Sequence, residues 1–519
     1  MSSELLAPLD LAFWHLESAE HPMHLGALAV FESRPGCDGE RILALLAERA
    51  AAIRRLRMRV RGVWLPVGGA AWVTHKEFDV HRHVRRIELP GADFAAEAAR
   101  AAGELMERPL ERGLPPWRMY VLTGPDDGRP GAPFAVLVKL HHALADGMRA
   151  VAIVAGILDQ LAAAPRRRGR PAPSRACPVD LAAFGAGCRF GAGERGAGAC
   201  SCKAEEGGDA ERRQPTTTRQ MCVPDPRVPG KIHRTGPRSW LPGPREVAGF
   251  ARDRVGEATR AVGIGASVVR ASRIEFGGAS ALAADSSGTR RLATAVLDGD
   301  EVQRVRRAFG GTANDVLLAV VAGGLRRWLL ERGSPLPGAA PRALVPVSRR
   351  RPGAAPGSGN KLSAYLLGLP VAEPDPVARL HAVRVAMERN KAAGPGRGAG
   401  AVAVLADRLP PLAHRFGAPL AQGAARLLFD LLVTSVPLPR TELSLGGCPL
   451  REIYPMAPLA RGQSLAVALS TYGGRVHVGL VADGKALPDL DRLAEALHEE
   501  LAALAEAVAP ASPAARGER

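Results

Sequence analysis

Residues 133–147 read PFAVLVKLHHALADG, and this stretch joins a predicted strand to a predicted helix. Residues 133–140 form an apolar run broken by one lysine, which is typical of a buried β-strand. Residues 147–164 are mostly apolar over a length that favours a helix. The junction between them is the kind of place where a rigid scaffold positions catalytic side chains at the mouth of a cleft.

Two adjacent histidines, His141 and His142, occupy this junction. Neighbouring residues on a strand point to opposite faces, so at most one of the two rings faces a given substrate channel. An unperturbed histidine pKa of about 6.5 lets the neutral ring accept a proton near neutral pH. Asp146 is placed to cap the following helix or to bind an arginine, and Gly147 to allow a tight turn. The whole arrangement favours catalysis over two surface histidines beside a capping aspartate.

The chain has two regions of regular periodicity on either side of an irregular one. Its 519 residues exceed one ordinary core, so we expect an α/β (α+β) fold of two lobes, at residues 1–165 and 286–509. Residues 166–240 hold 15 Lys and Arg against 7 Asp and Glu, with no sustained period, which predicts a disordered basic insert. Residues 241–285 are expected to form a helical connector and residues 510–519 a frayed tail.

The periodicity within the two lobes predicts a succession of helices and strands, as in an α+β fold. In the first lobe it indicates helices at 41–55 and 94–106, a hairpin at 60–73, and strands at 119–122 and 133–140. In the second lobe it indicates strands at 292–297, 342–347, 359–370, 431–436, 464–469 and 476–481, and helices at 301–309, 312–330, 376–391 and 490–508.

The net charge of +17 does not by itself indicate a nucleic-acid partner. Arginine-rich composition inflates the charge, and neither aromatic interleaving nor a nucleic-acid-binding module accompanies it. Attraction to an anionic membrane surface is a better interpretation, and compositional drift on a solvated face is the alternative. No segment reaches the roughly 18 unbroken apolar residues of a membrane span, and the N-terminus lacks signal-peptide features. We therefore expect a cytoplasmic protein whose association with membranes is peripheral.

The seven cysteines do not form a recognisable framework. Five of them crowd one irregular stretch, and no C-x-x-C pair occurs, so we expect no metal site. These five are Cys177, Cys188, Cys200, Cys202 and Cys222.

A second polar cluster precedes the apolar helix at 312–330. Thr312 and Asp315 have the spacing of a capping box, which accounts for both residues. Asn314, in the first turn, has two open interpretations: an ordinary helix-start residue, or an amide that stabilises a developing oxyanion beside the helix N-terminus.

The motif HHALADG at 141–147 resembles the signature of coenzyme A-dependent acyltransferases. The surrounding sequence is similar to the bacterial wax ester synthase/diacylglycerol acyltransferase family over roughly residues 5–165 and 285–508. Further segments carry the resemblance: Pro8-Leu-Asp10 with Phe13, His21–Gly26, Asn314–Val316, Arg342–Ser348, Gly359–Ser363 and Gly479–Asp483.

The resemblance implies a two-lobed fold of mixed sheets flanked by helices, with a substrate tunnel between the lobes. It also implies a peripheral association with the inner membrane or with lipid inclusions. It assigns His142 as the general base that deprotonates an acceptor hydroxyl, His141 as a structural residue and Asp146 as a loop-holding residue. It favours the oxyanion role for Asn314 and implies that acyl-CoA is a substrate, that no cofactor is needed, and that the acceptor is diacylglycerol or a long-chain alcohol. No nucleophilic serine is required, which agrees with the absence of a G-x-S-x-G elbow.

The sequence departs from the family pattern at two places. Residues 115–117 read PPW where the family tends to have PLW, and 434–439 read TSVPLP where it tends to have SNVPGP. The second change puts Ser435 in place of Asn and Leu438 in place of Gly, which alters a turn and a polar contact. Two alternatives to the lipid acyltransferase therefore stay open: a stand-alone condensation-type enzyme that uses carrier-bound thioesters, and a catalytically impaired homologue that binds lipid.

Overall fold

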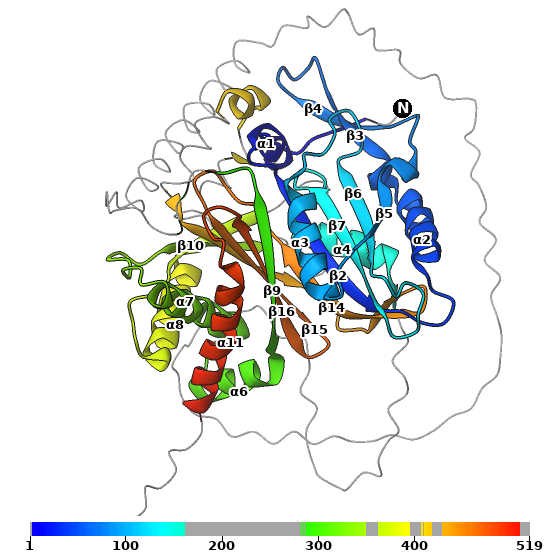
Figure 1. The fold of residues 1–519 in the computed structure, drawn as a ribbon. Helices are drawn as coiled ribbons and strands as arrows, with labels where there is room; N and C mark the ends of the chain where they lie inside the picture. Colours follow the sequence, from blue (N-terminus) through cyan, green and yellow to red (C-terminus); the bar gives the residue numbers. More distant parts are fainter. Residues whose placement is uncertain are drawn as a thin grey trace, which may run out of the picture. The chain divides into compact units, whose positions relative to one another are not determined.

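The computed structural model describes residues 3–160, 282, 284, 286–348, 362–394, 406–407, 409–417 and 428–508. The predicted insert at 166–240 and the tail at 510–519 lie outside the described residues, as does the connector at 241–285 apart from Leu282 and Ala284. The described secondary structure confirms the predicted class, because mixed sheets are flanked by helices (Figure 1).

The first sheet has seven strands in the order β5-β6-β7-β2-β14-β13-β8. Strand β7 lies near its centre and pairs antiparallel with both β6 and β2. The strands are β5 (Val84–Glu88), β6 (Trp117–Thr123), β7 (Pro133–His141), β2 (His24–Glu32), β14 (Cys448–Met456), β13 (Leu443–Leu445) and β8 (Asp159–Gln160). The helices of this lobe are α1 (Pro8–Leu16), α2 (Gly39–Ala52), α3 (Phe94–Glu107) and α4 (Gly147–Ile157).

A small three-stranded sheet lies in the same lobe, in the order β1-β4-β3. Strands β3 (Met58–Gly62) and β4 (Ala70–Thr74) form the antiparallel hairpin that the sequence predicted, and β1 (Glu4–Leu5) pairs with β4. Two short 3-10 helices, η1 (Arg54–Arg57) and η2 (Val80–Arg82), flank the hairpin in the chain.

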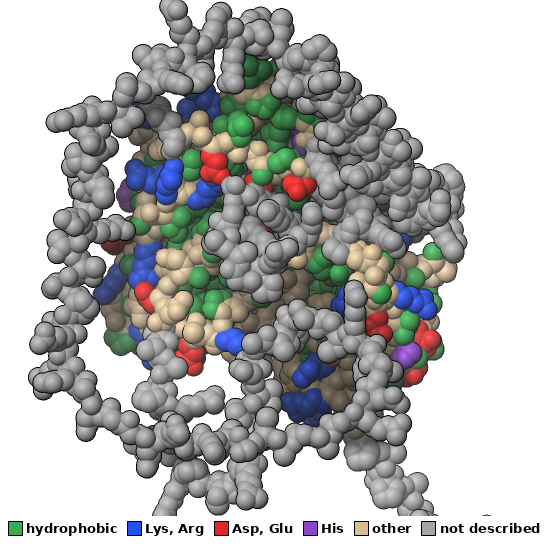
Figure 2. All heavy atoms as spheres, turned by 180° about the vertical axis from the view of Figure 1, so that it is seen from behind, with side chains coloured by type: hydrophobic (Ala, Val, Ile, Leu, Met, Phe, Trp, Pro, Cys, Tyr) green, Lys and Arg blue, Asp and Glu red, His purple; other side chains and the backbone are tan. Residues whose placement is uncertain are grey.

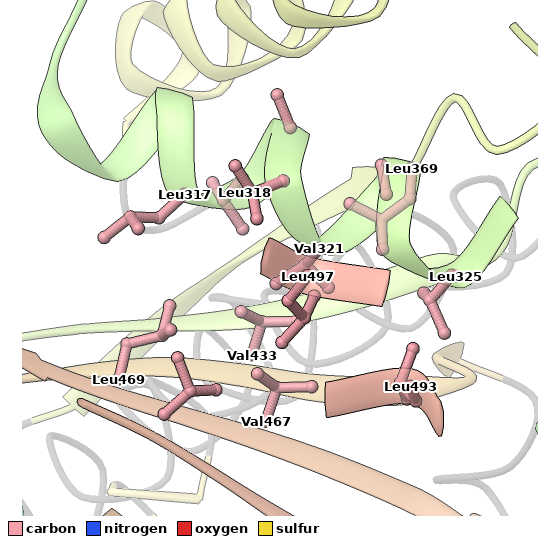
Figure 3. Packing of buried hydrophobic residues seen from close by; sticks show 14 of the residues in the cluster. Leu317, Leu318, Val321, Leu325, Leu369, Val433, Val467, Leu469, Leu493 and Leu497 are labelled. Atoms are coloured by element: carbon pink, nitrogen blue, oxygen red, sulfur yellow. The ribbon is translucent and has the colours of Figure 1, made fainter. Parts of the chain in front are cut away.

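The second sheet has six strands in the order β11-β10-β12-β15-β16-β9, with helices packed on one face. Figure 3 shows the apolar side chains of α7 and α11 over β12 and β15, including Val321, Leu497, Val433 and Val467. The strands are β9 (Arg290–Asp298), β10 (Arg342–Ser348), β11 (Leu362–Gly368), β12 (Leu431–Pro437), β15 (Leu465–Tyr472) and β16 (Arg475–Asp483). The helices are α6 (Gly299–Phe309), α7 (Ala313–Glu331), α8 (Pro376–Ala393) and α11 (Leu490–Glu506).

The two sheets are joined more closely than separate lobes would require. Strands β13 and β14 come from the C-terminal half of the chain, yet they complete the first sheet, with β14 paired to β2. Helix α3 contacts both β7 and β9, and a buried apolar cluster links the two sheets. At Gly479, whose motif the sequence singled out, a Cβ atom would lie 2.0 Å from the Pro455 carbonyl oxygen of β14. Only glycine allows the two backbones to approach this closely.

Helix α4 is shorter than predicted, because it ends at Ile157 instead of Ala164. The chain leaves the helix to form β8, in which Asp159 and Gln160 pair with β13. Residues 161–164 lie outside the described part of the chain.

Within the described residues, no single helix combines the length and apolar character needed to cross a membrane. Helices α6 and α7 meet these criteria only as a pair, and they are bent by 104° at the break between them.

Candidate active site

His142 is the first residue after β7, at the start of a turn. The backbone still follows the sheet here, because the His142 amide donates to the Met23 carbonyl oxygen over 2.8 Å. The His142 ring is stacked on Phe13 of α1, with ring centroids 4.0 Å apart. Backbone pairing and ring stacking together fix the direction of the imidazole.

The His142 ring lines a cavity of about 830 Å³ between the two sheets. Its walls come from α1, α4, β2 and β7 on one side and from β10, β11, β12 and β15 on the other. Most of the lining is apolar, and examples are Leu9, Leu140, Val151, Leu344 and Leu432. The sequence resemblance led us to expect a substrate space between the lobes, and the cavity lies there.

Burial is the main cause that lowers the pKa of His142 to about 4, and nearby His141 contributes in the same direction. A backbone hydrogen bond of His142 itself and the carboxylate of Asp146 act in the opposite direction but do not offset burial. The ring is therefore neutral at pH 7, which is the protonation state of a base.

His141 points away from the cavity and is completely buried. Its Nδ1 accepts a hydrogen bond from the Ala143 amide over 2.9 Å, so its proton is on Nε2. That Nε2 lies 3.4 Å from Glu17 Oε1, and His24 Nε2 lies 3.1 Å from the same oxygen. The separation of the two rings agrees with the strand alternation that the sequence analysis used.

Glu17 is the residue of this site that the sequence analysis missed. Burial alone would raise its pKa, but hydrogen bonding to His141 and His24 lowers the pKa below its ordinary value. Arg112 also contacts the carboxylate, with its Nη2 3.0 Å from Oε2. Glu17 lies 124 residues before His141 in the chain, and no local pattern in the sequence links the two.

Lys139, two residues before the histidines, is a buried cation on β7. Its Nζ donates to the Leu105 carbonyl oxygen over 2.7 Å and also to that of Arg108, at the end of α3. Burial lowers its pKa to about 7. The lysine therefore ties the end of α3 to β7, the strand that leads to His142.

Asp146 and Gly147 begin α4 beside the cavity. Asp146 is buried, and its Oδ1 accepts the Arg149 amide over 2.8 Å, so the predicted capping role is confirmed. The prediction of a tight turn at Gly147 is wrong, because this residue lies inside the first turn of α4 and does not have a positive φ. A Cβ atom at Gly147 would meet no described atom within 4 Å, and the residue lines the cavity. The glycine leaves space in the cavity and does not bend the chain.

The polar residues at the start of α7 do not share one role in the structure. Thr312 and Asp315 form the predicted capping box, with Thr312 N donating to Asp315 Oδ2 over 2.8 Å. Asn314 is half-buried in the first turn of α7 and is not among the described residues that line the cavity. Helix α7 packs on one face of the second sheet, in contact with α11 and α8.

Both departures from the family pattern lie near the site. Ser435 and Leu438 line the cavity, and Leu438 also packs against the apolar core of the first lobe. Trp117 is completely buried and donates through Nε1 to the Leu56 carbonyl oxygen over 2.7 Å, while the Pro116 carbonyl accepts the His141 amide. The change at 434–439 therefore lies at the cavity, whereas residues 115–117 contact the end of β7.

Across the described ranges, no group of three or more His, Cys, Asp or Glu side chains is placed to hold a metal ion. The five clustered cysteines lie outside these ranges.

Two models of one protein family together match most of the chain. Residues 6–317 match the wax ester synthase/diacylglycerol acyltransferase catalytic domain, and residues 358–505 match the C-terminal domain of the same family. The chain belongs to the wax ester synthase/diacylglycerol acyltransferase family. Membership confirms the resemblance that the motifs indicated and identifies the chain as an acyltransferase.

Individual relatives agree with this family over nearly their full length. The probable diacylglycerol O-acyltransferase tgs1 of Mycobacterium tuberculosis is 29% identical over 509 residues, covering 96% of this chain and 95% of the relative. The wax ester synthase/diacylglycerol acyltransferase of Marinobacter aquaeolei VT8 has a similar fold, with a TM-score of 0.62, 21% identity, and coverage of 97% and 99%. The trichothecene 15-O-acetyltransferase of Fusarium sporotrichioides shares the fold with a TM-score of 0.55, 10% identity, and coverage of 96% and 94%.

Proposed function

We propose that this acyltransferase transfers a long acyl chain from acyl-CoA to the hydroxyl of diacylglycerol or of a long-chain alcohol, with His142 as general base. The observation that carries the proposal is the position of a neutral imidazole in the wall of a large apolar cavity between the two sheets. Long acyl chains are excluded from water, and a cavity of this size and lining suits them.

The proposed reaction is a direct transfer. His142 accepts the proton of the acceptor hydroxyl as its oxygen attacks the thioester carbonyl carbon. The tetrahedral intermediate then collapses with cleavage of the carbon–sulfur bond, and the leaving thiolate takes the proton from His142. The products are an ester and free coenzyme A, so acyl-CoA is a substrate and no cofactor is needed.

His142 Nε2 is the nitrogen that we assign to proton transfer, because Nδ1 is buried in the protein. Stacking on Phe13 holds the ring while the hydroxyl approaches. The low pKa of His142 in the free enzyme keeps its ring unprotonated over the physiological pH range. Exclusion of water by the apolar walls favours transfer to the lipid hydroxyl over hydrolysis of the thioester.

The developing oxyanion needs hydrogen-bond donors. Gly147 and Met148 line the cavity in the first turn of α4, where backbone amides lack partners within the helix and the helix dipole favours negative charge. We assign these amides the main role and keep the side chain of Asn314 as a second donor that requires a rearrangement at the start of α7. Asn314→Ala distinguishes the two, because loss of an oxyanion donor lowers kcat by about 10²–10³-fold.

We also propose that the enzyme is cytoplasmic and works at the inner membrane or at lipid inclusions, because its acceptors dissolve there. The net charge of +17 supports attraction to an anionic lipid surface.

The decisive experiment measures thiol release from long-chain acyl-CoA with a panel of alcohol and diacylglycerol acceptors. Release is expected only with an acceptor, and His142→Ala is expected to lower it by at least about 10²-fold. His83→Ala is the matched control, because His83 is another buried ring of the first lobe, just before β5, stacked on Trp117 and not among the cavity-lining residues. It should lower thermal stability but keep activity per folded molecule.

Three results would contradict the proposal. If His142→Ala leaves thiol release unchanged, His142 is not the general base. Faster transfer from a carrier-bound thioester than from acyl-CoA favours the condensation-type alternative. Tight lipid binding by the wild-type protein without thiol release favours the impaired homologue.

A further inference from the structure

Exposed apolar side chains gather at two segments, the tip of the β3–β4 hairpin and residues 412–416. Trp64, Leu65 and Val67 at the tip of the β3–β4 hairpin are 85%, 63% and 52% exposed, and Leu412 and Phe416 are 42% and 72% exposed. Scattered apolar residues are normal on a protein surface, but five in two short segments need an explanation. Figure 2 shows hydrophobic side chains, with Lys and Arg beside them, at the upper end of the described surface, where Figure 1 shows β3 and β4.

The two segments are in direct contact. Gly68 has a φ of +79°, and a Cβ atom on it would lie 3.3 Å from backbone atoms of Pro411 and Leu412. His15 of α1 reaches the same turn, with Nε2 3.4 Å from the Gly68 carbonyl oxygen. The exposed side chains therefore belong to one surface, which we call the portal surface: Trp64, Leu65, Val67, Leu412 and Phe416.

The portal surface borders the cavity that contains His142. Residues 411–417 form a short helix in which Ala413, His414 and Gly417 line the cavity. Leu412 and Phe416 are four residues apart, so they share a different side of the helix, and both are exposed. This one short helix thus lies between an apolar cavity and an apolar outer surface.

The charge of the portal surface has one sign. Residues 58–74, MRVRGVWLPVGGAAWVT, contain two arginines and no acid, and residues 409–417, LPPLAHRFG, contain one arginine and no acid. Arg61 and Arg415 are exposed beside the apolar side chains. Exposed tryptophan, phenylalanine and leucine flanked by arginine are typical of segments that insert into the interface of an anionic bilayer.

We propose that the portal surface docks on an anionic phospholipid bilayer and lets the lipid acceptor pass from the bilayer into the cavity. The inference rests on the proposed function, because only a lipid-soluble acceptor needs this route. A second copy of the chain is a poorer occupant, since a symmetric contact would bring two positively charged surfaces together and block the cavity.

The test is flotation of the full-length protein with vesicles. Wild-type protein is expected to float with vesicles that contain phosphatidylglycerol, to bind less to pure phosphatidylcholine, and to lose binding in high salt. The double variant Trp64→Ser/Phe416→Ser is expected to bind at least about tenfold less tightly, since it removes two large inserted side chains. Leu330→Ser is the matched control, because Leu330 is 51% exposed at the end of α7 and outside the portal surface; its binding should be unchanged.

Activity assays separate this inference from the proposed function. Neither Trp64 nor Phe416 lines the cavity, so the double variant should keep thiol release with a short, water-soluble alcohol and lose it with diacylglycerol in vesicles. His142→Ala should show the reverse pattern, with binding retained and both reactions lost. Equal binding by the double variant and wild type overturns the docking surface, as does an equal loss in Leu330→Ser. A wild-type dimer that the double variant converts to monomer assigns the surface to a second copy and overturns the proposal as well.

Discussion

Two glutamates whose side chains have little exposure, one in each lobe, have different kinds of partner. Glu17 faces His24 and His141 beside the catalytic turn, whereas Glu500 of α11 forms a buried ion pair with Arg379 of α8. Arginine stays charged at every pH that a protein tolerates, but histidine does not. The second lobe therefore uses its carboxylate to hold helices together through partners that stay charged. The first lobe uses its carboxylate to orient a ring next to the proposed base, and this contact depends on pH.

The surroundings of Glu500 support a purely structural role. Arg327 of α7 also contacts this carboxylate, with Nε 3.2 Å from Oε2, so three helices meet on one side chain. A Cβ atom at Gly323 would lie 2.0 Å from the Glu500 carboxyl carbon, and glycine there makes room for it. None of these residues lines the cavity.

The largest expected effect on stability comes from Glu500→Gln. The change leaves Arg379 buried without its counter-charge, and such losses destabilise proteins by about 3–5 kcal/mol. Chemical denaturation measures the change in the free energy of unfolding, and thiol release per folded molecule should stay within about twofold of wild type. If Glu500→Gln loses activity but keeps its full stability, Glu500 acts on the reaction and does not differ from Glu17 in this respect.

The first lobe should be sensitive to acid over a defined range. Burial lowers the pKa of His24 to about 4, while the unfolded chain protonates near 6.5. Between these values the unfolded state binds more protons, so the free energy of unfolding decreases as the pH falls from about 6.5 to 4. The lowered pKa values of His142 and Glu17 act in the same direction.

For His24 alone the loss is about 3 kcal/mol. Thermal unfolding between pH 7 and pH 4 measures the loss, and His24→Gln should flatten the profile. A profile that stays unchanged in this variant would show that His24 does not carry the acid sensitivity.

Glu17→Gln should lower activity more than stability. The amide keeps the size of the side chain but loses the charge that faces His141, so the turn that carries His142 is held less accurately. Small misplacements of this kind cost about 10²-fold in rate. The measurement is kcat against KM for thiol release: kcat should fall while KM stays nearly constant. Partial rescue is expected from Glu17→Asp, and a purely structural Glu17 would show neither the kcat effect nor the rescue.

Leu438→Gly should change which acceptor is preferred. The leucine side chain lines the cavity at a position where the family pattern has glycine, so its removal lengthens or widens the apolar space. Differences of this size are worth about 1–3 kcal/mol in substrate discrimination. Competition between alcohols of different length measures the ratio of kcat/KM values, and we expect it to shift toward the larger acceptor. An unchanged ratio would place the acceptor elsewhere in the cavity.

Thr312→Ala should have the smallest effect. It removes the side chain that caps α7 and should lower the free energy of unfolding by about 1 kcal/mol. Thiol release per folded molecule should be unchanged, because Thr312 does not line the cavity. Denaturant titration beside the activity assay checks both outcomes, and a fall in kcat would tie the start of α7 to the chemistry.

The sequence was most informative where the determining forces are local. Apolar periodicity predicted β7, α3 and the hairpin of β3 and β4 within a few residues, and the spacing of Thr312 and Asp315 predicted their capping box. The motif at 141–147 predicted that one of its two histidines faces a substrate space, because this depends only on a strand, a turn and a helix in succession. The family resemblance assigned that position to His142, which lines the cavity.

The features that escaped prediction depend on distant parts of the chain. Strand β14 contains Pro449 and Pro455, which are uncommon inside a sheet, and it is stabilised by pairing with β2 more than 400 residues away. Glu17 acquires its role only when α1 is packed beside the end of β7. Gly147 was misjudged because a glycine that leaves room in a cavity and a glycine that allows a turn look the same in a sequence.

The position of β14 also sets an order on the synthesis of the protein. Strand β2 pairs along one edge with β7, the strand that leads to His142, and along its other edge with residues 450–456 of the 519-residue chain. The growing chain must therefore carry an open strand edge until nearly all of it has left the ribosome. Fragments that end after the first lobe should expose this edge and aggregate, even though they contain the whole catalytic motif.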